Sequence, residues 1–169
     1  MIILGIDPGT ALTGYAVIQT HAAKVRDEKP KVIDFGCIAT SAGGKPGERL
    51  KYIHQEVSML VKKHKPDLMA IESLFFFKNA KTVMPVAQAK GVILLAAADY
   101  NVPVQEFTPL QIKMTMVGYG RAEKKQVQAM TFQLLDLSSF DFKVKHRKKD
   151  DAADALGVAL CASLHGVKN

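Results

Sequence analysis

The first ten residues, Met1-Ile-Ile-Leu-Gly-Ile-Asp-Pro-Gly-Thr10, are the most informative about the fold, because a continuous apolar run ends abruptly in a turn. Residues 2–6 have the length and character of a buried strand. Pro8 and Gly9 then turn the chain immediately after Asp7. We therefore expect Asp7 to stand at the end of a buried strand, with its carboxylate facing solvent.

The same pattern recurs in the middle of the chain. A short apolar run, Leu68-Met-Ala-Ile71, is entered from Lys65-Pro66-Asp67 and ends at Glu72. This spacing predicts a second strand that presents an acidic side chain where it ends.

A third acidic element lies near the C-terminus, in an alanine-rich segment with high helix propensity. Asp151 and Asp154 are three residues apart, so both project from one face of a helix. Asp150 is four residues from Asp154 and shares that face, so helical geometry does not choose between Asp150 and Asp151. Carboxylates gathered from strand ends and a helix would repel one another without a cation between them, and oxygen ligands of this kind suit Mg²⁺ or Mn²⁺.

The order of the remaining segments predicts an α/β fold with a mixed five-stranded sheet flanked by helices. Short polar connections imply that the first three strands are antiparallel neighbours. We expect strands at 2–7, 14–19, 32–39, 68–71 and 102–107, and helices at 46–64, 80–100, 108–117, 123–135 and in the alanine-rich segment.

Size and charge restrict the class of protein. A chain of 169 residues is most simply one domain spanning 1–169. The net charge of +7 favours a polyanion such as nucleic acid as partner. Cys37 and Cys161 lack the spacing of a zinc site and are interpreted as buried thiols. No apolar run approaches the ~18 residues that cross a bilayer, so we expect a cytoplasmic protein without membrane contact.

Two segments have the composition of DNA-contacting surfaces. The basic run at 143–149, which includes Arg147, Lys148 and Lys149, directly precedes the acidic helix and is expected to contact phosphates. Three consecutive phenylalanines at 75–77 cannot all point inward, so at least one is expected to be exposed, where it could stack on a base.

Several motifs, in this order, together resemble the RuvC family of Holliday junction resolvases, which have a ribonuclease-H-like fold. The resemblance covers nearly the full chain. The motifs are Ile6-Asp-Pro-Gly-Thr10, Ala70-Ile-Glu-Ser73 with Phe75, Ala89-Lys-Gly91, Gly118-Tyr-Gly120 with Ala122-Glu-Lys124, and Asp151-Ala-Ala-Asp-Ala-Leu156.

The resemblance implies roles for individual residues. Four acids match the family's metal-binding catalytic positions, and here the family match selects Asp151 over Asp150. Phe75 matches an aromatic residue at the junction crossover, although Phe76 and Phe77 remain alternatives. Lys113 and Lys124 match lysines that face DNA. The four acids are Asp7, Glu72, Asp151 and Asp154.

The implied reaction is hydrolysis of DNA phosphodiesters by water, assisted by two Mg²⁺ ions for which Mn²⁺ may substitute. No Ser-His-Asp or cysteine nucleophile pattern competes with water. The family resolves four-way junctions in recombination and repair by paired nicks in strands of like polarity, leaving 5′-phosphate and 3′-hydroxyl ends. This implies a homodimer, for which the apolar helix at 80–100 is the expected interface, and a branch-migration complex as further partner.

Two other functions fit part of the sequence. The segment 7–14 also resembles the phosphate loop of actin-like and sugar-kinase ATPases, but those proteins clamp nucleotide between two lobes and this chain has room for one. A catalytically silent junction-binding protein would not need the complete acidic set.

Overall fold

The computed structural model describes residues 1–20, 28–73, 80–138 and 149–166, with only the backbone described for residues 80–82 and 149–151. A five-stranded sheet runs through it in the order β3-β2-β1-β4-β5. β1 is antiparallel to β2 and β2 to β3, whereas β1, β4 and β5 are parallel. The mixed sheet is confirmed. The strands are β1 (Ile2–Asp7), β2 (Leu12–Gln19), β3 (Lys31–Ala39), β4 (Leu68–Glu72) and β5 (Val104–Phe107).

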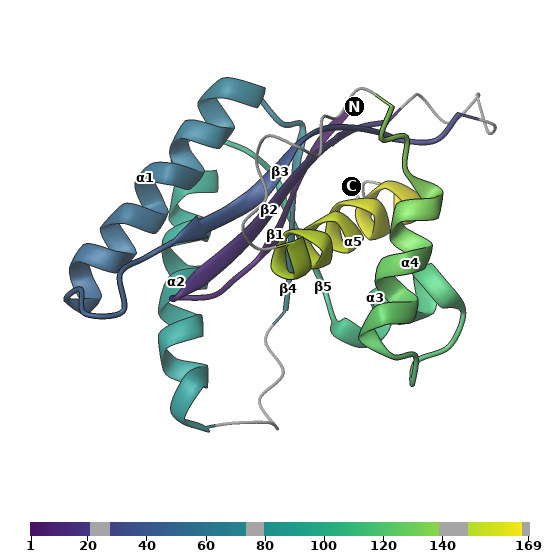
Figure 1. Ribbon diagram of the computed structural model, residues 1–169. Coiled ribbons are helices and arrows are strands. Elements are labelled where there is room, and N and C mark those ends of the chain that lie inside the picture. Colours follow the sequence, from purple (N-terminus) through teal and green to yellow (C-terminus); the bar gives the residue numbers. More distant parts are fainter. Residues whose placement is uncertain (21–27, 74–79, 139–148, 167–169) are drawn as a thin grey trace.

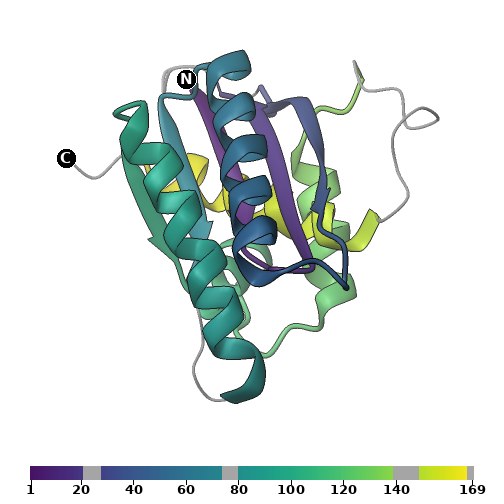
Figure 2. The ribbon, with the colours of Figure 1, turned by 90° about the vertical axis from the view of Figure 1, so that its left-hand side faces the viewer.

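Helices cover both faces of the sheet, as expected (Figure 1). α1 (Pro46–His64) and α2 (Ala80–Asp99) lie on one face, side by side in Figure 2. On the other face α5 (Lys149–His165) packs directly on β1 and β2, while α3 (Pro109–Val117) and α4 (Lys124–Leu134) pack against α5. Within the described ranges, no helix is long and apolar enough to span a bilayer.

β5 is two residues shorter than expected, because Val102, which precedes it, is hydrogen-bonded to the end of α2. Asn101 has a positive φ of 54°, and the Val102 amide donates to the Ala97 carbonyl at 2.9 Å, which closes the helix. Pro103 has no amide hydrogen to offer a neighbouring strand. The strand therefore begins at Val104 rather than at Val102.

The apolar character of β1 follows from its central position. Ile3 faces the core beneath α5, whereas Leu4 and Ile6 face the core beneath α1 and α2. Both faces of the strand are thus covered by helices, and a strand in this position reads as a continuous apolar run rather than an alternating one.

Gly5 allows α5 to approach β1 closely. A Cβ atom at this position would lie 2.5 Å from the carbonyl oxygen of Ala155 and 2.7 Å from the Cβ of Ala159. The alanines on the facing side of α5 are fully buried against the sheet. Small residues on both partners therefore set the distance between helix and strand.

We predict that Gly5→Ala destabilises the protein by at least ~1–3 kcal/mol, since the new methyl group meets backbone atoms that cannot rotate away. Urea denaturation measures the free energy of unfolding. Gly47→Ala in α1 is the matched control, because a Cβ there meets nothing within 4 Å. Equal stability of the two variants would contradict the close approach of α5.

Candidate active site

Asp7 and Glu72 end two neighbouring parallel strands. Ile6 pairs with Ile71 across β1 and β4, and the two acids directly follow that pair. Their side chains share a hydrogen bond. The expected placement at strand ends is therefore confirmed, but Asp7 is partly buried rather than fully facing solvent.

Hydrogen bonds tether the turn that follows Asp7. The Thr13 hydroxyl donates to the Gly9 carbonyl, and the Thr40 hydroxyl donates to the Thr10 carbonyl, both at 2.6 Å. The Arg49 Nε in turn donates to Thr40 Oγ1 at 2.8 Å. The turn is thus held by β2 and by residues near the start of α1, which fixes the backbone next to Asp7.

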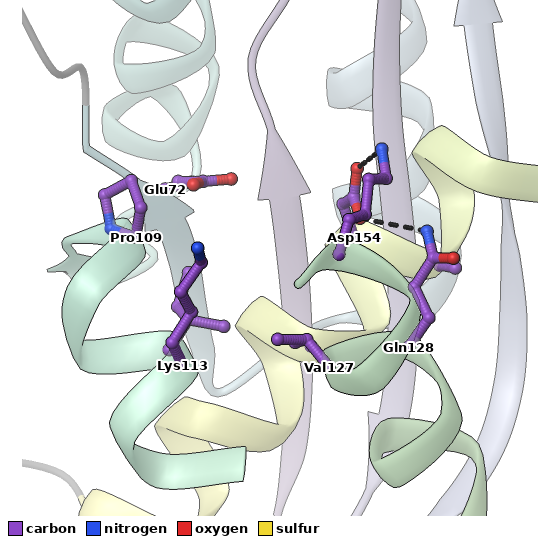
Figure 3. A pocket seen from close by; sticks show the side chains of 10 residues that line it. Glu72, Pro109, Lys113, Val127, Gln128 and Asp154 are labelled. Carbon is purple, nitrogen blue, oxygen red and sulfur yellow. Dashed lines mark hydrogen bonds and ion pairs between the residues drawn. The ribbon is translucent and has the colours of Figure 1, made fainter. Parts of the chain in front are cut away.

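Asp154 faces Glu72 across a cavity of about 200 Å³. Figure 3 shows Glu72 reaching in from the end of β4 and Asp154 from α5 on the opposite side. Lys113 of α3 rises beside Glu72. Lys124 and Gln128 of α4 line the cavity on the side of Asp154. Three helices and a strand thus contribute charged or polar groups to one small space.

The helix starts help to place the two lysines. Thr108 caps α3: its hydroxyl accepts from the Gln111 amide at 3.1 Å, and the Gln111 side chain accepts from the Thr108 amide at 2.8 Å. In α4 the Gln126 side chain accepts from the Glu123 amide at 2.8 Å, one residue before Lys124. Such reciprocal caps satisfy amides that the first turn leaves unpaired. Lys113 and Lys124 therefore extend from well-defined helices.

The environment of Glu72 opposes its negative charge. Burial and the nearby charge of Asp154 raise the pKa of Glu72 from 4.5 to about 7. The hydrogen bond with Asp7 and the positive charges of Lys124 and Lys113 act in the opposite direction, with smaller effect. The two lysines thus only partly offset the effects of burial and of the neighbouring carboxylate on Glu72.

The remaining expected site residues are described only in part. Asp151 belongs to α5, but its side chain lies outside the described part of the chain, as does that of Lys149. Phe75, Arg147 and Lys148 lie outside the described residues altogether. Among the described side chains, no three acidic, histidine or cysteine groups converge closely enough to hold a metal ion.

Gln128 is a cavity residue that the sequence reasoning missed. Its Nε2 donates to Asp154 Oδ1 at 3.3 Å, across 26 residues of sequence. The sequence feature that could have identified Gln128 is its position four residues after Lys124, which places both side chains on one face of a helix.

The raised pKa of Glu72 predicts a pH-dependent stability. A carboxyl group with a raised pKa binds its proton more tightly in the folded state. That stabilisation is fully present below 4.5 and is lost as the pH rises through about 7. Glu72→Gln lacks this titration, so its melting temperature should rise relative to wild type between about pH 5 and about pH 8.5 in EDTA. Glu48→Gln removes an exposed carboxyl group in α1 and is the control, and an equal rise in both variants would contradict the assignment to Glu72.

Sequence comparisons place this site in a known family. The family model described as crossover junction endodeoxyribonuclease RuvC matches residues 3–162. The RuvC protein of Syntrophomonas wolfei is 48% identical over 161 residues, covering 95% of this chain and 87% of that protein. The RuvC protein of Fusobacterium nucleatum is 46% identical over 160 residues, covering 95% of this chain and 78% of that protein.

The solved structures agree with the sequence match. Thermus thermophilus RuvC superposes with a TM-score of 0.83 at 29% identity, covering 98% of this chain and 95% of that one. T. thermophilus RuvC in complex with a Holliday junction substrate gives the same TM-score at 30% identity, covering 98% and 94%. These likenesses confirm the expected ribonuclease-H-like fold. The chain belongs to the RuvC family of crossover junction endodeoxyribonucleases.

Proposed function

We propose that this protein is a structure-selective endonuclease that resolves four-way DNA junctions during recombination and repair. The convergence of Glu72 and Asp154 on one cavity, with Lys113 and Lys124 beside them, carries the proposal. Carboxylates can hold divalent cations, and lysines can neutralise a phosphate. The T. thermophilus RuvC structure with a Holliday junction substrate, 30% identical to this chain, supports this choice of substrate.

The chemistry of the site fits Mg²⁺, with Mn²⁺ as a substitute. Burial first and the charge of Asp154 second raise the pKa of Glu72, and a bound cation would favour its ionised form. We assign Asp7, Glu72, Asp151 and Asp154 as catalytic metal ligands, and infer two ions per site. When bound, such ions activate water and stabilise the leaving oxygen in phosphodiester hydrolysis. The acids on β1, β4 and α5 orient that water, while Lys113 and Lys124 hold the phosphate.

Further DNA contacts are proposed for residues whose side chains lie outside the described part. Phe75 follows Glu72 by three residues and is assigned as the ring that stacks at the crossover, with Phe76 and Phe77 as alternatives. Arg147, Lys148 and Lys149 directly precede and begin α5, so we assign them to phosphates near the acids. We propose that the protein acts in the cytoplasm. We also propose that it works there with a branch-migration complex.

We also propose that the protein acts as a homodimer, because paired nicks in two strands require two active sites. α2 carries a stripe of exposed residues whose spacing along the helix alternates between four and three. These residues are Met84, Gln88, Gly91, Leu95 and Ala98. This spacing resembles that of a helix-pairing seam. The proposed interface is therefore limited to the exposed face of α2, because Ala89, Ile93 and Ala96 of the same helix belong to the core. Leu95 is 53% exposed and Met84 66% exposed, so they are the apolar anchors of this face.

The central experiment compares cleavage of a synthetic four-way junction with that of a matched linear duplex. In Mg²⁺ the wild type should nick only the junction, as two symmetric cuts resolved on a denaturing gel. Asp7→Asn and Asp154→Asn should abolish cleavage but leave junction affinity within a few-fold, because the basic contacts remain. Asp151→Asn should also be inactive, with Asp150→Asn as its matched active control. Near-normal cleavage by Asp154→Asn would overturn the metal-ligand assignment.

The dimer proposal predicts that Leu95→Glu produces monomers, since a charge would be buried at the centre of the α2 stripe. Sedimentation analysis measures the mass directly. Leu164→Glu places the same charge on an equally exposed leucine near the end of α5 and is the control, expected to stay dimeric. A monomeric wild type, or a dimeric Leu95→Glu variant, would contradict this interface.

A further inference from the structure

Both carboxylate oxygens of Asp154 are bound by side chains of α4. The Lys124 ammonium donates to Oδ2 at 2.5 Å, and the Gln128 amide donates to Oδ1 at 3.3 Å. The two donors are four residues apart, one turn along the helix. The Asp154 side chain is 25% exposed, so its carboxylate is still reached by solvent. Figure 3 shows both interactions on the Asp154 side of the cavity.

Lys124 binds the same carboxylate oxygen that a metal ion at Asp154 would use. Mg²⁺ binds oxygen at about 2.0–2.1 Å and demands a near-octahedral shell. The Lys124 ammonium, 2.5 Å from Oδ2, occupies one lone-pair direction of that oxygen, and its positive charge would repel an ion approaching the other. Asp154 Oδ2 is therefore a weaker metal ligand while Lys124 is bound to it than after the lysine has left.

The two donors differ in their freedom to leave. Lys124 is the first residue of α4, at the rim of the cavity, and its side chain is 54% exposed. Its long, flexible stem can swing the charge outward without disturbing the helix. Gln128 lies one turn deeper and is half-buried, and its amide carries no charge to repel a cation.

We propose that α4 controls metal loading at Asp154 by exchange. Lys124 competes with the metal for Oδ2 and moves to a DNA phosphate when the metal binds. Gln128 stays on Oδ1 as a positioning residue that keeps Oδ2 aimed into the cavity. This inference rests on the proposed function, because it needs both a metal and a phosphate at the site.

This exchange couples the two binding events, so that the metal and the junction DNA each increase the affinity of the protein for the other. A phosphate that draws Lys124 away removes a competitor for Asp154, so junction DNA raises the affinity for metal. By thermodynamic reciprocity the metal raises the affinity for junction DNA by the same factor. The catalytic site is thus completed mainly where a phosphate is present, and free protein holds its metal weakly.

The test is Mn²⁺ titration of the DNA-free protein by calorimetry, with three variants of matched side-chain length. Lys124→Met should bind Mn²⁺ several-fold more tightly than wild type, because the competitor is gone. Gln128→Met should bind several-fold more weakly, because Asp154 loses its orienting donor. Lys125→Met removes the same charge from the next residue of the helix, which is exposed, and should change affinity much less than Lys124→Met. Melting temperatures establish that each variant is folded before titration.

A second measurement repeats the Mn²⁺ titration with a saturating four-way junction. The junction should tighten Mn²⁺ binding in wild type, and this gain should shrink markedly in Lys124→Met but persist in Gln128→Met. Equal effects of Lys124→Met and Lys125→Met would overturn the exchange and leave only a general charge effect. Unchanged Mn²⁺ affinity in Gln128→Met would overturn its positioning role. A wild type that binds neither Mn²⁺ nor the junction would instead overturn the proposed function itself.

Discussion

The close packing of α5 on β1 is the constraint on which the rest of the site depends. Because Gly5 has no side chain, the backbone of α5 at Ala155 approaches the strand more closely than any other residue would allow. Asp154 precedes that contact by one residue, so its position relative to the end of β4 is set by this approach. A larger residue at position 5 would push the helix outward and carry Asp154 away from Glu72. The geometry of the acidic pair is thus a consequence of core packing.

The same packing creates an electrostatic conflict that suits a metal site. Folding brings Glu72 and Asp154 into one partly buried cavity, where burial and mutual repulsion raise the pKa of Glu72 to about 7. Lys113 and Lys124 reduce this cost without removing it. A site organised only for stability would not concentrate like charges in this way. Unfavourable charge in the folded protein leaves room for a cation to supply binding free energy, which is the expected trade between stability and function.

Polar contacts on the two faces of the sheet have different roles: those on one face stabilise the fold, and those on the other belong to the site. On the α1 side, Asp34 of β3 is nearly fully buried and binds Lys63 at 2.9 Å and His64 at 3.2 Å, which ties the end of α1 to the sheet edge. On the α5 side, the Lys124–Asp154 pair is partly open to solvent and adjoins a cavity. The His64–Asp34 contact is buried on both sides, with side chains 8% and 6% exposed, so removing one partner is expensive. An open pair can exchange partners at low cost, because water and phosphate can replace either member.

The helices, the strands and the two strand-end acids were predictable from the sequence, because each is encoded by adjacent residues. A buried strand that ends in a turn places its last residue at the sheet edge, so Asp7 and Glu72 could be located from adjacent residues. The bounds of α1 follow from its apolar spacing, and the order of strands and helices was enough to predict the mixed sheet. The resemblance to the RuvC family supplied the choice between Asp150 and Asp151, which helical spacing left open.

The contacts that hold the acids depend instead on how distant elements pack together. Lys124 and Gln128 reach Asp154 across 30 and 26 residues, from a different helix, and no local pattern records such a pairing. The same limit applies to α2, for which the apolar sequence predicts an interface but does not choose the face that forms it. Packing against the sheet and α1 instead buries Ala89, Ile93 and Ala96, and leaves Leu95 outside. Periodicity shows that a residue is apolar, but only the arrangement of neighbouring elements determines which apolar face meets the core and which meets a partner.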